Sequence, residues 1–377
     1  MAHVLVTGGA GFIGSRLSAR LVAEGHRVRV LDALITQVHG PDPDATSPLL
    51  RAVAGVGELH RGTVTSTDDL RAALEGIDTV VHLAAETGTG QSMYEIDRYV
   101  EANIGGTAKL MDLLTNEPHT VRRVVVASSR SIYGEGAYRT VAGAVVYPPH
   151  RTDAAMARGD FAVRGDDGEE LQVIPTSEDA ALHPSSVYGI TKQVQESLVM
   201  TVAPTIGVEA VSLRYQNVYG PGQSLTNPYT GILSIFSTLI RQGKGIDVFE
   251  DGLESRDFVY IDDVVEATYL AATSPAAAGG VFNIGSGTAT TVLEVVAALS
   301  DAFGVEVETS LTGRYRLGDI RHNVADTRRV TSVLGFQPTV SFAEGVRRFV
   351  EWVADEPLAA GDYERSLDEM AARRLLK

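Results

Sequence analysis

Short apolar segments rich in β-branched residues alternate along this chain with longer segments of mixed polarity. The apolar segments are typical of strands buried on both faces, and the mixed ones are typical of amphipathic helices. The pattern predicts strands at 4–7, 27–31, 79–83, 124–127, 208–213 and 281–284, helices at 94–114 and 185–202, and a strand–helix unit at 258–272. Because strands and helices alternate, we expect an α/β fold with a doubly wound parallel sheet.

Two stretches interrupt this alternation. The segment 135–184 is polar, rich in Pro, Gly and Asp, and too long for an ordinary connection, so we expect an inserted flap there. The pattern also loosens after 220–222 and returns within 256–284. We therefore predict a first domain over 1–217, to which 256–284 returns, and a second, smaller α/β domain for substrate binding over 218–255 and 285–377.

The first predicted strand runs into three regularly spaced glycines, Gly8, Gly11 and Gly14, and then into a helix. Such a turn leaves main-chain amides and the positive end of the helix dipole free to hold a diphosphate, as in a Rossmann-type dinucleotide site. The second predicted strand ends in Asp32, 18 residues after Gly14, where a carboxylate can accept hydrogen bonds from the adenosine ribose diol. A 2′-phosphate there would meet this negative charge, so the motif favours NAD over NADP.

A tyrosine–lysine pair and a run of hydroxyl groups are the candidates for catalysis. Of the 13 tyrosines, Tyr188 is the one followed by lysine four positions later, at Lys192. On a helix this spacing places both side chains on one face, so the ammonium can stabilise the phenolate and make Tyr188 a base near neutral pH. The run Ser128-Ser129-Arg130-Ser131 lies just past a predicted core strand, where open α/β sheets bind ligands, and its hydroxyls can hold the reacting oxygen.

Charge and composition restrict the partners. A net charge of −16 and a pI near 5.0 argue against nucleic acid and against an anionic membrane surface. The chain has no cysteine, which excludes disulfides and thiolate metal sites, and its acidic residues suggest no spaced ligand cluster, so we expect no metal. The first predicted strand begins near the third residue, and no apolar stretch approaches the roughly 20 residues of a membrane helix. These features predict a cytoplasmic enzyme.

Five further motifs accompany the glycine-rich turn and the tyrosine–lysine pair. They are His82-Leu83-Ala84-Ala85, Asn103-Ile104-Gly105-Gly106-Thr107, Asn217-Val218-Tyr219-Gly220-Pro221, Arg256-Asp257-Phe258-Val259-Tyr260-Ile261-Asp262-Asp263-Val264 and Phe282-Asn283-Ile284-Gly285. In order and spacing, the motifs resemble the extended short-chain dehydrogenase/reductase family, in particular its NAD-dependent nucleotide-sugar epimerases and dehydratases. This resemblance spans nearly the whole chain. It implies a bound NAD, a nucleotide-diphosphate sugar as substrate, and a homodimer formed by the helices at 94–114 and 185–202.

The resemblance also implies roles for particular residues. Ser129, Tyr188 and Lys192 are expected to be catalytic. The expected substrate contacts are Asn217, Arg256 and Arg321 at the diphosphate, Val248 and Phe249 at the base, and Thr87 and Ser129 at the hexose. The expected cofactor contacts are Gly8, Gly11, Phe12, Ile13, Gly14, Asp32, Thr63, Val64, Leu83, Ala84, Ala85, Asn103, Tyr188, Lys192 and Tyr215. Many members have an aspartate after the third strand, whereas this chain has Gly62-Thr63-Val64, so adenine recognition is expected to rest on the main chain.

The residues after Ser129 separate the subtypes of this family. Its 4,6-dehydratases place an Asp–Glu pair there to expel the C6 hydroxyl, whereas this chain has Arg130 and Ser131. Without a carboxylic acid, elimination lacks its general acid. Ketoreductases of the fold usually take NADPH, which Asp32 disfavours. Epimerisation is therefore the main prediction, and a dehydratase, a ketoreductase and a non-catalytic NAD-sensing protein are the alternatives. The runs 34–40 and 85–94 resemble the bacterial branch that includes dTDP-L-rhamnose 4-epimerase.

The predicted reaction inverts C4 of the sugar through a transient ketone. Tyr188 takes the proton of the 4-hydroxyl while hydride passes from C4 to NAD, and Ser129 holds the oxygen. The bound 4-keto sugar turns, and hydride then returns to its other face, so NAD is regenerated and need not be added. The base, the sugar and the direction of the reaction depend on the shape of the pocket rather than on these motifs.

Overall fold

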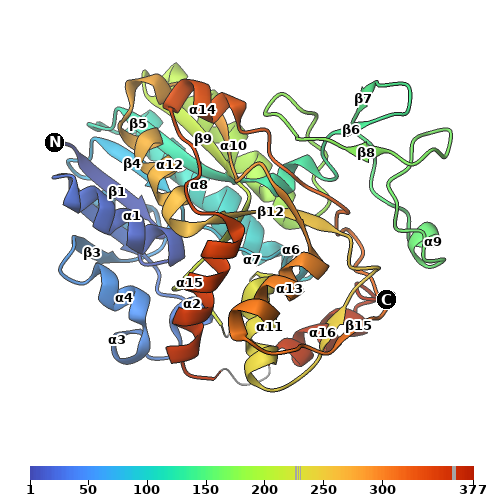
Figure 1. Ribbon diagram of the computed structural model, residues 1–377. Helices are drawn as coiled ribbons and strands as arrows, with labels where there is room; N and C mark the ends of the chain where they lie inside the picture. Colours follow the sequence, from blue (N-terminus) through green and yellow to red (C-terminus); the bar gives the residue numbers. More distant parts are fainter. Residues whose placement is uncertain (226, 228, 230, 359–361) are drawn as a thin grey trace.

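A seven-stranded parallel sheet with the order β3-β2-β1-β4-β5-β9-β13 forms the centre of the protein (Figure 1). The structure is a computed structural model that describes all 377 residues except 226, 228, 230 and 359–361. The predicted α/β fold of the Rossmann type is confirmed, because strands far apart in sequence pair in parallel around β1. The strands are β1 (His3–Thr7), β2 (Arg27–Asp32), β3 (Glu58–Arg61), β4 (Thr79–His82), β5 (Arg123–Ser129), β9 (Glu209–Tyr215) and β13 (Val281–Ile284).

Helices cover both faces of this sheet. Successive side chains of a strand point to opposite faces, so Val4 and Val6 of β1 pack in one hydrophobic cluster and Leu5 packs in another. The first cluster includes residues of α1 (Phe12–Ala23) and α12 (Ile261–Thr273), and the second includes residues of α5 (Thr67–Leu74), α8 (Gly106–Asn116) and α10 (Val187–Thr205). Burial on both faces explains why the strands appear in the sequence as continuous apolar runs.

A smaller α/β region follows β9 and contains two short sheets. One sheet joins β10 (Asn217–Tyr219), β12 (Ser255–Tyr260) and β14 (Ala289–Thr291), and the other pairs β11 (Ile246–Val248) with β15 (Thr309–Leu311). The helices of this region include α11 (Ile232–Arg241), α13 (Val292–Phe303) and α15 (Phe342–Asp355), which Figure 1 shows in the lower part of the view.

The strand–helix unit predicted at 258–272 is divided between the two regions. Its helix, α12, packs against α1, and the strand that follows, β13, joins the central sheet. Its own strand, β12, pairs in parallel with β10 and antiparallel with β14 rather than with a strand of the central sheet. This pairing places Arg256, on β12, beside the second region.

The polar segment 135–184 carries a small sheet of its own. Its strands are β6 (Tyr138–Arg139), β7 (Val145–Val146) and β8 (Gln172–Val173), and Tyr138, Val163 and Leu171 form its buried cluster. Figure 1 shows these strands and α9 (Asp153–Met156) extending away from the central sheet. Met156 and Phe161 pack on Tyr315, so the segment also reaches the C-terminal part of the chain.

The helix predicted at 94–114 is observed as three consecutive segments: α7 (Ile96–Tyr99), a π-helical turn at Val100–Gly105, and α8. The helix predicted at 185–202 is α10, which begins after Ser186, whose hydroxyl accepts a hydrogen bond from the amide of Gly189 at 3.1 Å. Among the residues that the structure describes, no helix is both long enough and apolar enough to cross a bilayer.

Candidate active site

Two cavities meet at Tyr188, beyond the carboxyl ends of β1 and β5. The first cavity has a volume of about 460 Å³ and begins at the turn between β1 and α1. The second cavity has a volume of about 330 Å³ and is lined by residues of both regions of the chain. Gly88, Tyr188, Tyr229 and Gly231 line both cavities, so a ligand in one can contact a ligand in the other.

The glycine-rich turn of the first cavity has no room for side chains. A Cβ on Gly14 would lie 2.4 Å from the carbonyl oxygen of Gly8, and a Cβ on Gly8 would lie 2.8 Å from the amide nitrogen of Ala84. Gly8 also has φ of +67°, which disfavours an L side chain. The cap of α1 is Gly11, which provides no side-chain hydrogen bond to the first amides of the helix. The turn therefore fits a diphosphate held by main-chain amides.

Asp32 lies at the end of β2 and lines the same cavity. Its two carboxylate oxygens accept hydrogen bonds from the amides of Ala10 and Leu34, each at 2.9 Å. These bonds orient a negative charge at the place where a dinucleotide of this fold has its adenosine ribose. The arrangement therefore fits NAD at the position predicted from the spacing.

The main chain expected to recognise adenine is partly occupied. The amide of Gly62 donates to the carbonyl of Asp32 at 3.1 Å, and the amide of Thr63 donates to the carboxylate of Asp69 at 2.9 Å. These two amides are therefore not available to a ligand, although Gly62, Thr63 and Val64 all line the cavity.

Every expected cofactor residue except Asn103 lines the first cavity. The lining includes Gly8, Gly11, Phe12, Ile13, Gly14, Asp32, Thr63, Val64, Leu83, Ala84, Ala85, Tyr188, Lys192 and Tyr215. Asn103 is fully buried in the π-helical turn, where its side chain accepts from the amide of Glu86 at 2.7 Å and donates to the carbonyl of Glu86 at 3.1 Å. Asn103 therefore does not line the cofactor cavity as expected. Its side-chain amide instead holds the loop after β4 in place.

Tyr188 and Ser129 are brought together as the sequence predicts. Ser129 ends β5, and its hydroxyl is hydrogen-bonded to the Ser131 hydroxyl at 2.7 Å. Burial is the largest effect and raises the pKa of Tyr188 above its usual value, although the hydrogen bond with Ser129 and the positive charge of Arg130 act to lower it. The structure therefore does not show the lowered pKa that the tyrosine–lysine spacing predicted. The phenol therefore lies in a water-poor place where a neighbouring hydroxyl and a cation favour its ionised form.

Lys192 lies one helical turn after Tyr188 but is engaged elsewhere. Its ammonium donates to the side-chain oxygen of Gln195 at 2.8 Å. Burial lowers the pKa of Lys192 to about 7, and the nearby carboxylate of Glu196 opposes this shift. The positive charge that acts to lower the pKa of Tyr188 is that of Arg130, so Arg130 is a candidate for the role that the helical spacing predicted for Lys192.

Sequence reasoning missed this role of Arg130, which it used only to argue against dehydration. Arg130 follows Ser129 and lines the second cavity. Burial and the charge of Arg256 lower the pKa of Arg130 to about 10, and Asp319 raises it, so the guanidinium is charged at neutral pH. The sequence did contain a signal for this role, because Arg130 comes directly after a predicted core strand, at the end where open α/β sheets bind ligands.

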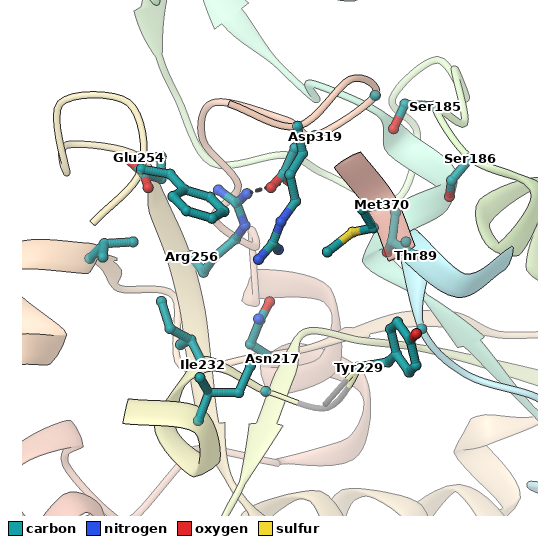
Figure 2. A pocket seen from close by; sticks show the side chains of 18 of the residues that line it. Thr89, Ser185, Ser186, Asn217, Tyr229, Ile232, Glu254, Arg256, Asp319 and Met370 are labelled. Atoms are coloured by element: carbon teal, nitrogen blue, oxygen red, sulfur yellow. Dashed lines mark hydrogen bonds and ion pairs between the residues drawn. The ribbon is translucent and has the colours of Figure 1, made fainter. Parts of the chain in front are cut away.

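The centre of the second cavity carries cations and unpaired polar atoms (Figure 2). Arg256 donates to Asp319 at 2.8 Å and to the carbonyl of Ile320 at 2.8 Å. The Nε of Arg316 and the Oδ1 of Asn217 are buried without a hydrogen-bond partner among the described residues. The guanidinium of Arg316 also lies 4.9 Å from the ring centre of Phe249. Cations and the free N–H donor of Arg316 beside an aromatic ring fit a nucleoside diphosphate, while the Oδ1 of Asn217 can accept a hydrogen bond from a ligand hydroxyl.

Four expected substrate contacts are absent from the described lining of the second cavity. Arg321 is absent from the described lining of both cavities, because its guanidinium is engaged by Glu250 at 3.0 Å and by Asp251 at 2.7 Å. Val248 is 1% exposed and packs in the hydrophobic core. Thr87 and Ser129, both expected at the hexose, line the first cavity rather than the second. Arg316, five residues before Arg321, is the arginine that the structure places at the predicted diphosphate site.

Comparison with known proteins agrees with this geometry. The model of the "NAD dependent epimerase/dehydratase family" matches residues 4–154 and 162–285, and the chain belongs to this family. Among curated proteins it is 38% identical to the dTDP-L-rhamnose 4-epimerase of Burkholderia thailandensis over 94% of this chain and 95% of that protein. It is 31% identical to the UDP-glucose 4-epimerase of Mycolicibacterium smegmatis over 93% of this chain and 98% of that protein.

Solved structures similar to this chain also include nucleotide-sugar epimerases with bound NAD. The UDP-glucuronic acid 4-epimerase of Bacillus cereus, in complex with UDP-glucuronic acid and NAD, is 26% identical with a TM-score of 0.75 over 93% of this chain and 99% of that one. MoeE5 in complex with UDP-glucuronic acid and NAD is 32% identical with a TM-score of 0.72 over 93% of this chain and 99% of that one. The predictions of the enzyme family and of NAD as cofactor are confirmed.

We expect Gly14→Ala to weaken NAD binding by about 10- to 100-fold, because its Cβ overlaps main-chain atoms that cannot move without opening the turn. NAD retained by the purified protein, released by denaturation and quantified by chromatography, measures the effect. Gly105→Ala is the matched control, since its Cβ would lie 3.8 Å from the nearest atom. Equal NAD content in the two variants would contradict the predicted role of the turn.

Proposed function

We propose that this protein is an NAD-dependent nucleotide-sugar 4-epimerase that inverts C4 through a transient 4-keto sugar. The observation that carries the proposal is the position of Tyr188, which lies with Ser129 and Arg130 where the two cavities meet. One cavity fits a dinucleotide and the other fits a nucleoside diphosphate, so the phenol lies between a cofactor and a sugar.

The chain's own residues move and hold the proton. Tyr188 takes the proton of the sugar 4-hydroxyl and later returns it, and Ser129 hydrogen-bonds the same oxygen. Bound NAD supplies the hydride acceptor and donor for C4. Arg130 stabilises the phenolate, while Arg256, Arg316 and Asn217 hold the diphosphate as the hexose turns within the cavity.

Arg130→Gln should move the acidic limb of the kcat–pH profile to higher pH. The reason is that the positive charge of Arg130 lowers the pKa of Tyr188, so its loss makes the phenol harder to ionise. Arg130→Lys keeps the charge and is the matched control, for which we expect a smaller shift. A profile of Arg130→Gln that overlays the wild type would exclude this electrostatic role.

Arg316→Gln should raise KM for the nucleotide sugar by about 10- to 100-fold, since it removes a charged hydrogen-bond donor from the diphosphate. Arg321→Gln should instead lower the melting temperature with little change in KM, because it removes the cation paired with Asp251 and one of the two arginines paired with Glu250. Steady-state kinetics and thermal unfolding of both variants check the assignment, which fails if Arg321→Gln is the variant with the raised KM.

Dehydration is the alternative function whose chemistry is related to epimerisation. The curated relatives include a dTDP-glucose 4,6-dehydratase from Streptomyces griseus that is 30% identical to this chain. Elimination of the C6 hydroxyl needs a general acid. Arg130, with a pKa of about 10, and the hydroxyl of Ser131 are poor acids at neutral pH. These residues therefore support epimerisation.

The test of the proposal is a screen of UDP-, dTDP-, GDP-, CDP- and ADP-sugars by NMR without added cofactor. We expect one nucleotide sugar to be converted to its C4 epimer with no change in mass. The relative from Burkholderia thailandensis makes dTDP-L-rhamnose the first candidate. Loss of water from the substrate would establish the dehydratase instead, and failure to convert any sugar that binds would favour a non-catalytic NAD sensor.

We further infer a cytoplasmic homodimer. The dimer interface would be formed by the helical segment 96–105 and by α10, which expose apolar side chains. Ile96 is 52% exposed, Val100 is 38% exposed and Ile190 is 47% exposed. Light scattering should give twice the mass of the 40.1 kDa chain, and a monomer mass would exclude the dimer. We also retain the division into a cofactor domain (1–217 with 256–284) and a substrate domain (218–255 and 285–377).

A further inference from the structure

A buried chain of hydrogen bonds leads away from the first cavity, and it begins at Lys192. The ammonium of Lys192 donates to the side-chain oxygen of Gln195, which is fully buried. An ammonium has three N–H groups, and among the described residues this is the one hydrogen-bond partner of Lys192. Because Lys192 lines the first cavity, two N–H donors are left for a ligand bound there.

The side-chain amide of Gln195 can face in only one direction. Its nitrogen donates to the hydroxyl oxygen of Thr107 at 2.8 Å. The Thr107 hydroxyl gives its own hydrogen to the carbonyl of Asn103 at 2.6 Å, so toward Gln195 it can only accept. Since the amide nitrogen must face Thr107, the amide oxygen must face Lys192.

His82 extends the chain of hydrogen bonds to the central sheet. Its Nε2 lies 3.0 Å from the hydroxyl oxygen of Thr107, and its Nδ1 lies 2.8 Å from the hydroxyl of Thr7. Because the Thr107 oxygen accepts, Nε2 carries the ring proton and Nδ1 accepts from Thr7. Thr7 is the last residue of β1, directly before the glycine-rich turn. The chain therefore joins Lys192 to the strand that ends at the dinucleotide turn.

The partner that holds Lys192 is a neutral amide rather than a carboxylate. Glu196, on the same helix, acts to raise the pKa of Lys192, but its carboxylate is hydrogen-bonded to Arg214. Burial and the charge of Lys192 lower the pKa of His82 to about 3, so this imidazole is neutral. The phenol of Tyr188 lies one helical turn away on α10. The ammonium is thus held by a dipole, which fixes its position without cancelling its charge.

We propose that Gln195 is a positioning residue for the cofactor, because its amide oxygen holds the ammonium of Lys192 at the wall of the first cavity and leaves two N–H donors for NAD. Gln195 is absent from the described lining of both cavities, so it acts through Lys192. The inference deepens the proposed function and rests on it, since it takes Lys192 to work beside Tyr188.

The test follows the protonation of Lys192 by NMR, with NAD added to saturation. The chain has four lysines, at positions 109, 192, 244 and 377, so lysine labelled with ¹³C at Cε gives four side-chain signals. The signal that disappears in Lys192→Arg belongs to Lys192. Its chemical shift, recorded against pH, reports the pKa of this one ammonium in the protein with its cofactor.

The two variants of Gln195 should move this titration in opposite directions. Gln195→Leu removes the oxygen that accepts from the ammonium, so the charged form is less stable and the titration should move to lower pH by about one unit. Gln195→Glu places a carboxylate there, which favours the charged form and should move the titration to higher pH. A side chain with a purely structural role would not produce opposite shifts.

The NAD retained by the purified protein is the second readout. Gln195→Leu should retain several-fold less NAD at neutral pH, because an ammonium that has lost its proton offers the cofactor weaker donors. Gln193→Leu is the matched control. It makes the same change two residues earlier on α10, at a partly exposed side chain that is absent from the described lining of both cavities. We expect the control to keep the wild-type titration and NAD content.

The outcomes separate this inference from the proposed function. If the Lys192 titration of both Gln195 variants overlays that of the wild type, Gln195 does not position Lys192 and the inference is overturned. If Gln195→Leu does not fold, the titration of Gln195→Glu decides, because an upward shift supports the inference and an unchanged curve overturns it. Opposite shifts in a protein that converts no nucleotide sugar would support the role of Gln195 and overturn the 4-epimerase proposal instead.

Discussion

Tyr188→Phe should lower kcat for epimerisation by about 10²- to 10⁴-fold, the contribution of a positioned acid–base group. The variant lacks only the phenolic oxygen, so the ring continues to fill the junction of the two cavities. Ser129 and Arg130 then have no phenolate to stabilise, and the proton of the sugar 4-hydroxyl has no acceptor. Retained NAD and the affinity for the nucleotide sugar should be unchanged.

The measurement is turnover by NMR, together with NAD content and calorimetric binding of the substrate. Tyr269→Phe is the matched control, because Tyr269 lies on α12 and is absent from the described lining of both cavities. We expect the control to keep wild-type activity. If Tyr188→Phe turned over within a few-fold of the wild type, the base would have to be another group.

Arg214→Met should lower the free energy of unfolding by about 3–5 kcal/mol, because it leaves a buried carboxylate without its cation. Arg214 and Glu196 form an ion pair at 2.5 Å, with side chains only 6% and 8% exposed. Arg214 also donates to the hydroxyl of Tyr133 at 2.9 Å and to the carbonyl of Glu178 at 2.8 Å. The guanidinium thus joins β9 to α10 and to the segment next to the active site.

Denaturant unfolding of the variant and the wild type checks this value. Arg347→Met is the matched control: it pairs with Glu344 and Glu351 at the surface, where water screens the charges, so the loss should be much smaller than for Arg214→Met. If Arg214→Met lowered the free energy of unfolding no more than Arg347→Met does, the buried pair would contribute little to stability.

The pair also makes stability depend on pH. Burial raises the pKa of Glu196, but the hydrogen bond and charge of Arg214 outweigh burial and lower it. A carboxyl group whose pKa is lower in the folded state stabilises the fold above its unfolded pKa, about 4.3 for Glu. This stabilisation is lost as the pH falls through the folded pKa, so acid should reduce the difference between the wild type and Arg214→Met.

Much of the fold and half of the site could be predicted from the sequence because the signals are local. A strand buried on both faces has a continuous apolar run, and the turn after β1 needs glycine at Gly8 and Gly14 for steric reasons that neighbours in sequence impose. The spacing from Gly14 to Asp32 follows from the length of one helix and one strand. Tyr188 and Lys192 are likewise one helical turn apart.

The second cavity was harder to predict because distant segments form it. Arg316 and Arg321 are near in sequence. Which of them lines the cavity is decided by the pairing of 315–317 with the C-terminal residues and by the carboxylates of Glu250 and Asp251. The charge of Arg130 is likewise influenced by a residue far away in the sequence, because the carboxylate of Asp319 raises the pKa of Arg130.

By itself, the sequence determined the α/β class, the dinucleotide turn and the tyrosine base, since each depends on residues within one strand–helix unit. The tertiary structure decided which cations line the second cavity, that Asn103 holds the loop after β4, and that residues of α16 (Asp362–Ala372) line one end of this cavity. The physical reason is that a buried charge or amide must find its partner in space, and that partner lies wherever chain topology brings a complementary group.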